Sequence, residues 1–269
     1  MVKLIQSETL KSNLDRLVNK INHGFFNNLI IFGPTRSGKS TLAVQIGCYL
    51  SQKIGVSFSN DDIFFDAGKM IKVAQIGKNR KVYVLDEAAF DLMGEDWQNK
   101  FQKMLIKIFM VAAKYNQTFI LLIPKLEKLR EFFISDEHTR AIQVYYNKKT
   151  LERGFFKAFS GQNLNLLYDA LRNKRYWKLK DIRPDFNGRF NKRINYIDID
   201  RYNKEKDDAI KNLGNKEKQD KYKIILVKLA MILKNEYKIP YKKISRQIGK
   251  NANYFSQITK ETHIKQDIR

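Results

Sequence analysis

The sequence predicts a mixed α/β fold, in which a mostly parallel β-sheet is flanked by helices and followed by a small all-α module. Short apolar segments alternate with segments of helical periodicity through the first half of the chain, a pattern typical of parallel sheets with right-handed crossovers. A basic, weakly periodic stretch then precedes a final region of helical spacing. The 269 residues are enough for two such domains.

The elements of the first domain follow from apolar runs and the residues that end them. Residues 28–32 predict a buried strand that ends at Gly33-Pro34, and residues 81–86 and 118–123 predict two more strands. The other predicted elements are helices at 38–52, 67–76 and 97–115, a short strand at 63–65, and an edge hairpin of residues 141–146 and 154–159. We expect a first domain at 1–173, a basic linker or arm at 174–218, and a second module at 219–269.

The composition indicates a folded protein with an acidic partner. Apolar residues make up 43% of the chain, which excludes a wholly disordered or collagen-like protein. The 51 Lys and Arg residues against 28 Asp and Glu give a net charge of +23, of which residues 174–269 carry +14. A field of this sign attracts polyanions, so nucleic acid is the first partner to consider.

Cysteine use and apolar run lengths predict the compartment. A single cysteine, Cys48, excludes an internal disulfide and a zinc site built from several cysteines. The longest apolar runs are too short to cross a bilayer, and the first residues lack a signal-peptide core. We therefore expect a cytoplasmic protein with no membrane association.

A phosphate-binding motif lies between the first predicted strand and the first predicted helix. Residues 33–40 fit the pattern G-x-x-x-x-G-K-[ST] in full, and this context is the one that the motif requires. Lys39 is expected to reach the β- and γ-phosphates of ATP, and the Ser40 hydroxyl to ligate Mg²⁺. The alternative is a chance glycine-rich turn. The predicted nucleotide-binding residues are Gly33, Pro34, Thr35, Arg36, Ser37, Gly38, Lys39, Ser40 and Thr41.

Two acidic residues end the strand at 81–86 in the form of a Walker B motif. Asp86 is expected to hold Mg²⁺ through water, and Glu87 to orient or deprotonate the attacking water. An Asp-Glu pair at a strand end is otherwise an ordinary solvated turn. Together with the glycine-rich loop, the pair favours hydrolysis of ATP over nucleotide binding alone.

At residues 31–40, at 85–88 and in the strand that ends at Leu122-Ile123-Pro124, the chain resembles RecA-fold P-loop ATPases of the HerA/FtsK group. It is especially similar to small phage and archaeal-virus ATPases with a domain like that of the zonula occludens toxin, over about residues 25–172. The resemblance implies ATP-driven movement of DNA, often by a ring in which one subunit completes the next subunit's site. This chain has Pro124-Lys125 where many relatives have a polar sensor, and it lacks the transmembrane segment of the filamentous-phage relatives.

An arginine from a neighbouring subunit is a further expectation. Arg130, Arg140 and Arg153 flank the strands that follow the Walker B motif, and we favour Arg140 as catalytic because it immediately precedes a predicted core strand. A surface or structural role is the alternative for each. Arg36, inside the loop, is equally compatible with a γ-phosphate contact and with a position in solvent.

The last module resembles helix-turn-helix DNA-binding domains. Residues 222–236 and 241–249 predict two helices, and Gly249 leads to Asn251, which would cap a third helix at 252–260. A three-helix packing or oligomerisation unit is the alternative. The side chains expected to contact duplex DNA are Lys250, Asn253, Tyr254, Ser256, Gln257 and Lys260.

These expectations combine into an ATP-dependent DNA-binding motor of a virus, plasmid or other mobile element. Such a protein would hydrolyse ATP to move or package DNA, and the resemblance implies that it works as a homo-oligomer such as a ring. The alternative is an ATPase switch that acts as a helicase loader or transposition regulator. A third class is a signalling or defence ATPase whose last module binds protein. DNA binding that does not stimulate ATP hydrolysis would favour this third class.

Overall fold

The computed structural model describes residues 5–77, 79–86, 95–193 and 196–255. It divides into two compact units, residues 1–209 and 210–269. The boundary falls inside helix α7 (Ile199–Asn235) and therefore differs from the predicted boundaries at 173 and 218. Residues 174–209, which the sequence predicts as a linker, belong to the first unit.

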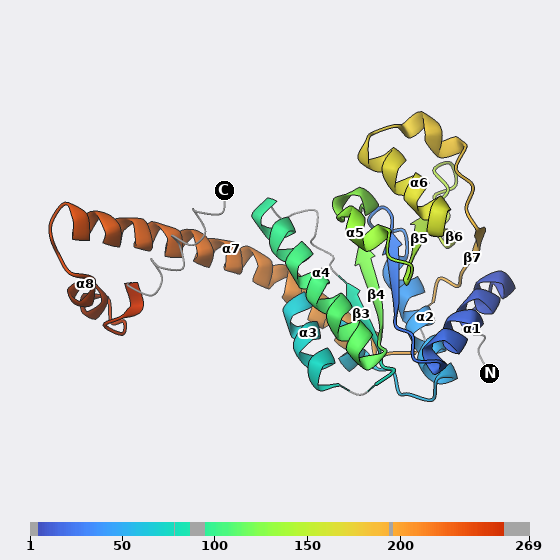
Figure 1. The fold of residues 1–269 in the computed structure, drawn as a ribbon, viewed down its shortest axis with the longest axis horizontal. Coiled ribbons are helices and arrows are strands. Elements are labelled where there is room, and N and C mark those ends of the chain that lie inside the picture. The colour runs from blue at the N-terminus through green and yellow to red at the C-terminus, as the bar shows by residue number, and fades with distance from the viewer. Residues whose placement is uncertain (1–4, 78, 87–94, 194–195, 256–269) are drawn as a thin grey trace. The chain divides into compact units, whose positions relative to one another are not determined.

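The first unit is built on a seven-stranded, mostly parallel sheet (Figure 1). Its strand order is β2-β3-β4-β1-β5-β6-β7. The first five strands are parallel to one another, β6 is antiparallel to β5, and β7 is antiparallel to β6. The mixed α/β prediction is confirmed. The strands are β1 (Asn27–Phe32), β2 (Ile63–Phe64), β3 (Val82–Asp86), β4 (Thr118–Ile123), β5 (Thr139–Tyr145), β6 (Phe155–Ser160) and β7 (Phe186–Arg189).

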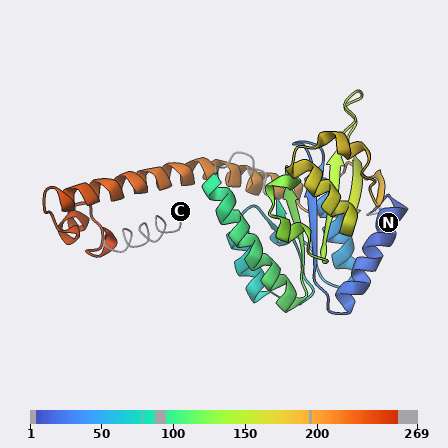
Figure 2. The same cartoon turned by 45° about the horizontal axis from the view of Figure 1, so that its top comes forward.

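Helices cover both faces of the sheet, as Figures 1 and 2 show. Alternate residues of a strand point to opposite faces, so Leu29 and Ile31 of β1 join one apolar cluster, and Ile30 and Phe32 join the other. The first face packs against α1 (Glu8–Asn22) and α2 (Lys39–Lys53). The second packs against α3 (Ala67–Ile76), α4 (Glu95–Tyr115), α5 (Glu131–Ile134) and α6 (Gly161–Arg172).

Local signals locate most of these elements, and pairing between distant segments locates the rest. The bounds of α3 and β4 agree with the sequence prediction to the residue. Strand β7 lies in the predicted linker and is not an apolar run; backbone pairing with β6 creates it. Three short 3₁₀ helices, at Asn60–Asp62, Leu126–Lys128 and Tyr176–Lys180, also belong to the described part of the first unit.

The segment after β7 is attached to the core by side-chain amides. Gln45 of α2 donates from Nε2 to the carbonyl oxygens of Asn191 at 2.7 Å and Arg193 at 3.1 Å. Asn60 exchanges two hydrogen bonds with the backbone of Asp198, at 2.8 and 3.0 Å. Asp198 in turn accepts the N–H of Arg201, the contact of an N-cap residue, so the start of α7 has a defined position on the first unit.

The second unit comprises the rest of α7, helix α8 (Tyr241–Gln247) and a turn that leads into Tyr254 and Phe255. Its buried apolar residues include Ala230, Ile244 and Phe255. The predicted helix at 222–236 is part of the longer α7, and most of the predicted third helix, residues 256–260, lies outside the described residues. Among the described helices, none is long and apolar enough to span a membrane.

Candidate functional site

The loop between β1 and α2 has a shape that its glycines make possible. Gly33 and Gly38 have φ values of 143° and 102°, in the region that side chains disfavour. A Cβ atom on Gly33 would lie 2.0 Å from the carbonyl oxygen of Val144, and one on Gly38 would lie 3.1 Å from the ring of Phe190. The loop is therefore packed between the end of β5 and the segment after β7, and both glycines are required.

Polar groups in this loop suit an anion. The first turn of α2 has backbone N–H groups without helical acceptors, at the positive end of the helix dipole. Ser37 is fully buried, and its hydroxyl has no hydrogen-bond partner among the described residues, which is costly unless a ligand supplies one. Lys39 donates from Nζ to the carbonyl oxygens of Gly33 at 2.7 Å and Pro34 at 2.9 Å, so its ammonium group lies over the loop.

Asp86, at the carboxyl end of β3, lies beside the start of α2. Ser40 donates from Oγ to Asp86 Oδ2 at 2.7 Å, although 46 residues separate the two. Strand β4 lies between β1 and β3, and all three are parallel, so their carboxyl ends meet at one edge. The structure thus brings together the serine and the aspartate that the sequence predicts as metal ligands.

Two residues that the sequence patterns did not indicate complete this cluster. Tyr202 and Lys206, four apart on α7, also donate to Asp86 Oδ2: Tyr202 from its hydroxyl, and Lys206 from Nζ at 2.9 Å. Burial, together with the nearby Asp86 carboxylate, raises the pKa of Tyr202, so its hydroxyl keeps its proton and remains a donor. One sequence signal could have indicated this pair. Asp198 is a residue type that caps helices, and Tyr202 and Lys206 follow it at intervals of four residues, which places both on the same face of a helix.

No protein-family model matches this chain, and no curated protein matches its sequence. A hydroxyl and a carboxylate are oxygen ligands that Mg²⁺ accepts, usually with waters and substrate phosphates as the remaining ligands. The described residues include no group of three His, Cys, Asp or Glu side chains that could hold a metal. Ser40 and Asp86 therefore offer two oxygen ligands and not a complete metal site.

Arg140 does not join this cluster within its own chain. It lies near the amino end of β5, in register with Leu29, whereas the loop follows the carboxyl end of β1. Its half-buried guanidinium donates from Nη1 to the carbonyl oxygen of His138 at 3.2 Å and to Asn27 Oδ1 at 3.5 Å. Burial lowers the pKa of Arg140. These contacts suit a structural arginine better than one that reaches another subunit.

The remaining predicted residues divide between exposed and undescribed positions. Thr35 and Arg36 of the loop are exposed, as are Arg130 and Arg153; Arg153 lies between β5 and β6 at the loop's edge of the sheet. Glu87 lies outside the described residues, as do Ser256, Gln257 and Lys260. In the second unit, Lys250 and Asn253 are exposed, and the Lys250 ammonium group lies 5.8 Å from the centre of the partly buried Tyr254 ring.

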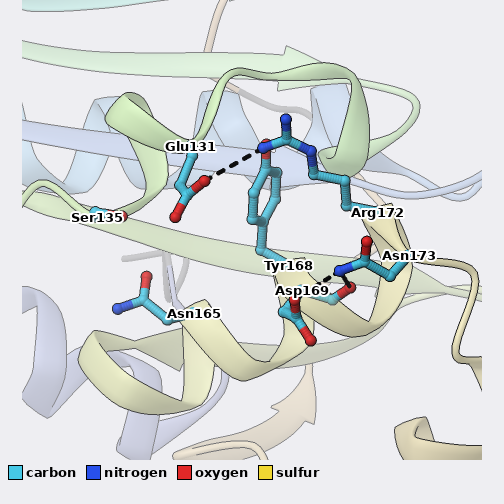
Figure 3. A pocket seen from close by; sticks show the side chains of 7 residues that line it. All are labelled: Glu131, Ser135, Asn165, Tyr168, Asp169, Arg172 and Asn173. Atoms are coloured by element: carbon cyan, nitrogen blue, oxygen red, sulfur yellow. Dashed lines mark hydrogen bonds and ion pairs between the residues drawn. The ribbon is translucent and has the colours of Figure 1, made fainter.

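A separate polar hollow lies between α5 and α6 (Figure 3). Several of its polar groups contact one another: Arg172 Nη1 lies 3.4 Å from Glu131 Oε2 and 3.1 Å from the Tyr168 hydroxyl, and Asn173 donates to Asp169 Oδ1 at 2.6 Å. None of the residues predicted to bind nucleotide lines it. The lining residues are Glu131, Ser135, Asn165, Tyr168, Asp169, Arg172 and Asn173.

Proposed function

We propose that the protein is a P-loop ATPase that binds ATP with Mg²⁺ at the loop of residues 33–40 and hydrolyses it. The observation that carries this proposal is the hydrogen bond of Ser40 to Asp86 beside a loop that needs its two glycines. The predicted parallel sheet places these two residues at the same end of the sheet, and the hydrogen bond joins them across 46 residues.

The residues would act on the phosphates by position and charge. Lys39, whose ammonium group lies over the loop, would exchange the carbonyl oxygens of Gly33 and Pro34 for phosphate oxygens. The Ser37 hydroxyl would gain an acceptor. Ser40 and Asp86 would hold Mg²⁺, which neutralises phosphate charge when bound. Glu87, next to Asp86 in the sequence, would orient the attacking water.

We further propose that hydrolysis serves movement or packaging of DNA in the host cytoplasm, for a virus, plasmid or other mobile element. The net charge of +23 and the resemblance to RecA-fold ATPases of the HerA/FtsK group support this role. Under the same proposal the second unit is a helix-turn-helix module that contacts duplex DNA through Lys250, Asn253 and Tyr254, and the protein works as a homo-oligomer, which a ring would satisfy.

One observation favours a second candidate, an ATPase switch that loads a helicase or regulates transposition. Asp86 contacts α7, and the same helix continues along the chain into the second unit, so occupancy of the site can alter that helix. ATP-dependent displacement of a protein roadblock from duplex DNA separates the two candidates. A motor displaces the roadblock processively, whereas a switch binds DNA and leaves it in place.

Hydrolysis is tested first by paired variants of the full chain. Glu87→Gln should bind ATP and hydrolyse it slowly, because the nucleotide contacts remain while the general base is lost. Asp86→Asn should change the dependence of the rate on Mg²⁺ concentration. Turnover by Glu87→Gln at the wild-type rate under saturating Mg-ATP would refute the role of Glu87, and absence of nucleotide binding by the wild type would refute the proposed function.

A further inference from the structure

We propose that Lys206 is a built-in cation that occupies the metal side of the site, and that it must leave Asp86 before Mg-ATP binds. This inference rests on the proposed function, because it assigns a regulatory role at the same site. Lys206 belongs to the first unit and is held there by the attached start of α7. The ATPase would then be restrained until nucleotide displaces this residue.

The contacts of the ammonium group carry the inference. Lys206 Nζ lies 2.9 Å from Asp86 Oδ2 and 3.4 Å from Ser40 Oγ. These are the two oxygens that the proposed function assigns to the metal. Asp86 is 4% exposed, so the ion pair is shielded from solvent more than a surface pair is. Mg²⁺ can bind these oxygens only if the ion pair of Lys206 with Asp86 is broken, and the ammonium group repels Mg²⁺ as long as it stays nearby.

The surroundings hold Lys206 in this position. Tyr202 contacts the same carboxylate oxygen, accepts from Lys206 Nζ at 3.2 Å, and packs against Phe65 with ring centres 5.4 Å apart. One turn earlier, Arg201 pairs with Asp61 and, at 2.8 Å, with Glu205. The carboxylates that follow Lys206 directly along α7, at positions 207 and 208, are exposed to solvent, which screens their attraction for the ammonium group.

A nucleotide-binding measurement on the full chain tests the inference. Lys206→Met keeps the length of the side chain and removes its charge. With a fluorescent, non-hydrolysable ATP analogue, we expect Lys206→Met to bind about tenfold more tightly than the wild type in excess Mg²⁺, a difference of about 1.4 kcal/mol, because Asp86 no longer has to give up a shielded ion pair. In EDTA, which removes Mg²⁺, the affinities of the wild type and of Lys206→Met for the analogue should agree within about twofold. Lys204→Met, an exposed lysine on the same helix, is the matched control and should behave as the wild type.

The outcomes separate this inference from the proposed function. If the wild type binds the analogue with Mg²⁺, Lys39→Ala does not, and Lys206→Met has wild-type affinity, the inference is overturned while the proposed function stands. If neither the wild type nor Lys206→Met binds the analogue, both are overturned. Should Lys206→Met fail to fold, Lys206→Gln keeps a donor for Asp86 without the charge; we expect about threefold tighter binding, and wild-type affinity overturns the inference.

A different observation supports a second inference, which is independent of ATP. We infer that the 3₁₀ helix Tyr176–Lys180 and its flanks form a binding surface for single-stranded nucleic acid. Tyr176 and Trp177 are 57% and 67% exposed, although Leu179 and Ile182 pack against the core and hold the segment. The cations interspersed with these aromatic residues are Lys174, Arg175, Lys178, Lys180 and Arg183, all exposed.

The chemistry of this surface matches an unpaired strand. Bases stack on exposed aromatic rings when they are not already stacked in a duplex, and lysine and arginine neutralise the phosphates beside them. Asp181 is the single acidic residue among residues 174–183, so the segment carries a net positive charge that attracts polyanions. Single-stranded DNA and RNA share this chemistry. The surface belongs to the first unit, whereas the residues proposed to contact duplex DNA belong to the second.

Oligonucleotide binding by the full chain tests this surface. We expect Tyr176→Ala combined with Trp177→Ala to bind oligo(dT) and oligo(U) about tenfold more weakly than the wild type, with duplex affinity changed less than about twofold. Ile76→Ala, which removes an apolar side chain that is 89% exposed, is the control. Preference for one oligonucleotide identifies the natural strand. Equal single-strand affinities in the double variant and the control, or no single-strand binding by the wild type, overturn the inference and favour a protein partner.

Discussion

The two units of the chain differ most in how much apolar surface they bury. The first packs helices on both faces of a sheet, with fully buried side chains such as Ile30 and Phe119. The second buries Ala230, Ile244 and Phe255, while Ile225 and Leu229 of α7 remain 59% and 53% exposed. A large core holds polar groups at set distances, and a small core leaves most side chains at the surface.

This difference suggests a division of labour. In the first unit, Ser40 and Asp86 are held together by three strands and a helix, and the proposed phosphate chemistry would require such precise positions. In the second unit, Lys250 and Asn253 are exposed beside a short turn, which suits contacts to a large partner. Variants placed in one unit at a time either sharpen this contrast or break it.

The largest expected effect concerns the two cores. Phe119→Ala should lower the free energy of unfolding of the first unit by about 4 kcal/mol, because Phe119 is fully buried and stacks on Tyr83 with ring centres 5.6 Å apart. Phe255→Ala should disrupt the second unit and leave the main transition in place. Urea denaturation followed by circular dichroism measures both. A main transition that shifts equally in both variants would show that the two units unfold together.

Cys48 is a second probe of the first unit. Burial, and secondarily the Asp62 carboxylate, raise the pKa of its thiol from 9.0 to about 12. Labelling by a disulfide reagent at about pH 8 should therefore be about a thousandfold slower than in the urea-unfolded chain, because the thiolate is the reacting form. Since the folded-state pKa is raised, the associated stability is present below pH 9.0 and is lost as the pH rises toward about 12. Phe255→Ala, in the second unit, should leave the labelling rate of Cys48 unchanged. Faster labelling in this variant would show that the stability of the first unit depends on the second.

The next effect concerns the chemistry. Lys39→Ala should reduce ATP hydrolysis about a hundredfold, because one preorganised cation at the phosphates is lost. Its affinity for duplex DNA should equal that of the wild type if the second unit supplies that contact. Lys72→Ala, which removes an exposed lysine of α3, is the control for charge alone. A loss of duplex affinity in Lys39→Ala but not in Lys72→Ala would place DNA contacts at the nucleotide site.

The smallest expected effect concerns the second unit. Lys250→Ala should weaken duplex binding a few-fold for all sequences alike and lower the slope of log affinity against log salt by roughly one, as for one lost phosphate contact. Asn253→Ala should instead reduce sequence preference more than total affinity. Fluorescence anisotropy at several salt concentrations measures both, and ATP hydrolysis should not change. An unaltered salt slope in Lys250→Ala would remove this lysine from the DNA contact.

The sequence by itself determined the elements whose signals are local. An apolar run that ends at Pro124 located β4, and helical spacing over residues 67–76 located α3. The glycine-rich loop was equally local, because G-x-x-x-x-G-K-[ST] constrains neighbouring residues. The contact of Ser40 with Asp86 followed from the parallel sheet that these elements predict, since carboxyl ends of parallel strands share an edge.

Only the tertiary structure decided which distant segments meet. β7 forms a strand because its backbone hydrogen-bonds to β6. Its residues are exposed or half-buried, so the sequence contains no apolar run that would have predicted this pairing. Arg140 lies at the end of the sheet opposite the loop because β5 runs parallel to β1, so that the start of β5 lies beside the start of β1. The sequence places Arg140 at the start of a strand but does not specify the direction of that strand in the sheet. Tyr202 and Lys206 reach Asp86 because Asn60 and Gln45 attach the preceding segment to the core. Long-range contacts depend on packing across the whole unit, whereas periodicity and capping report on a few neighbouring residues.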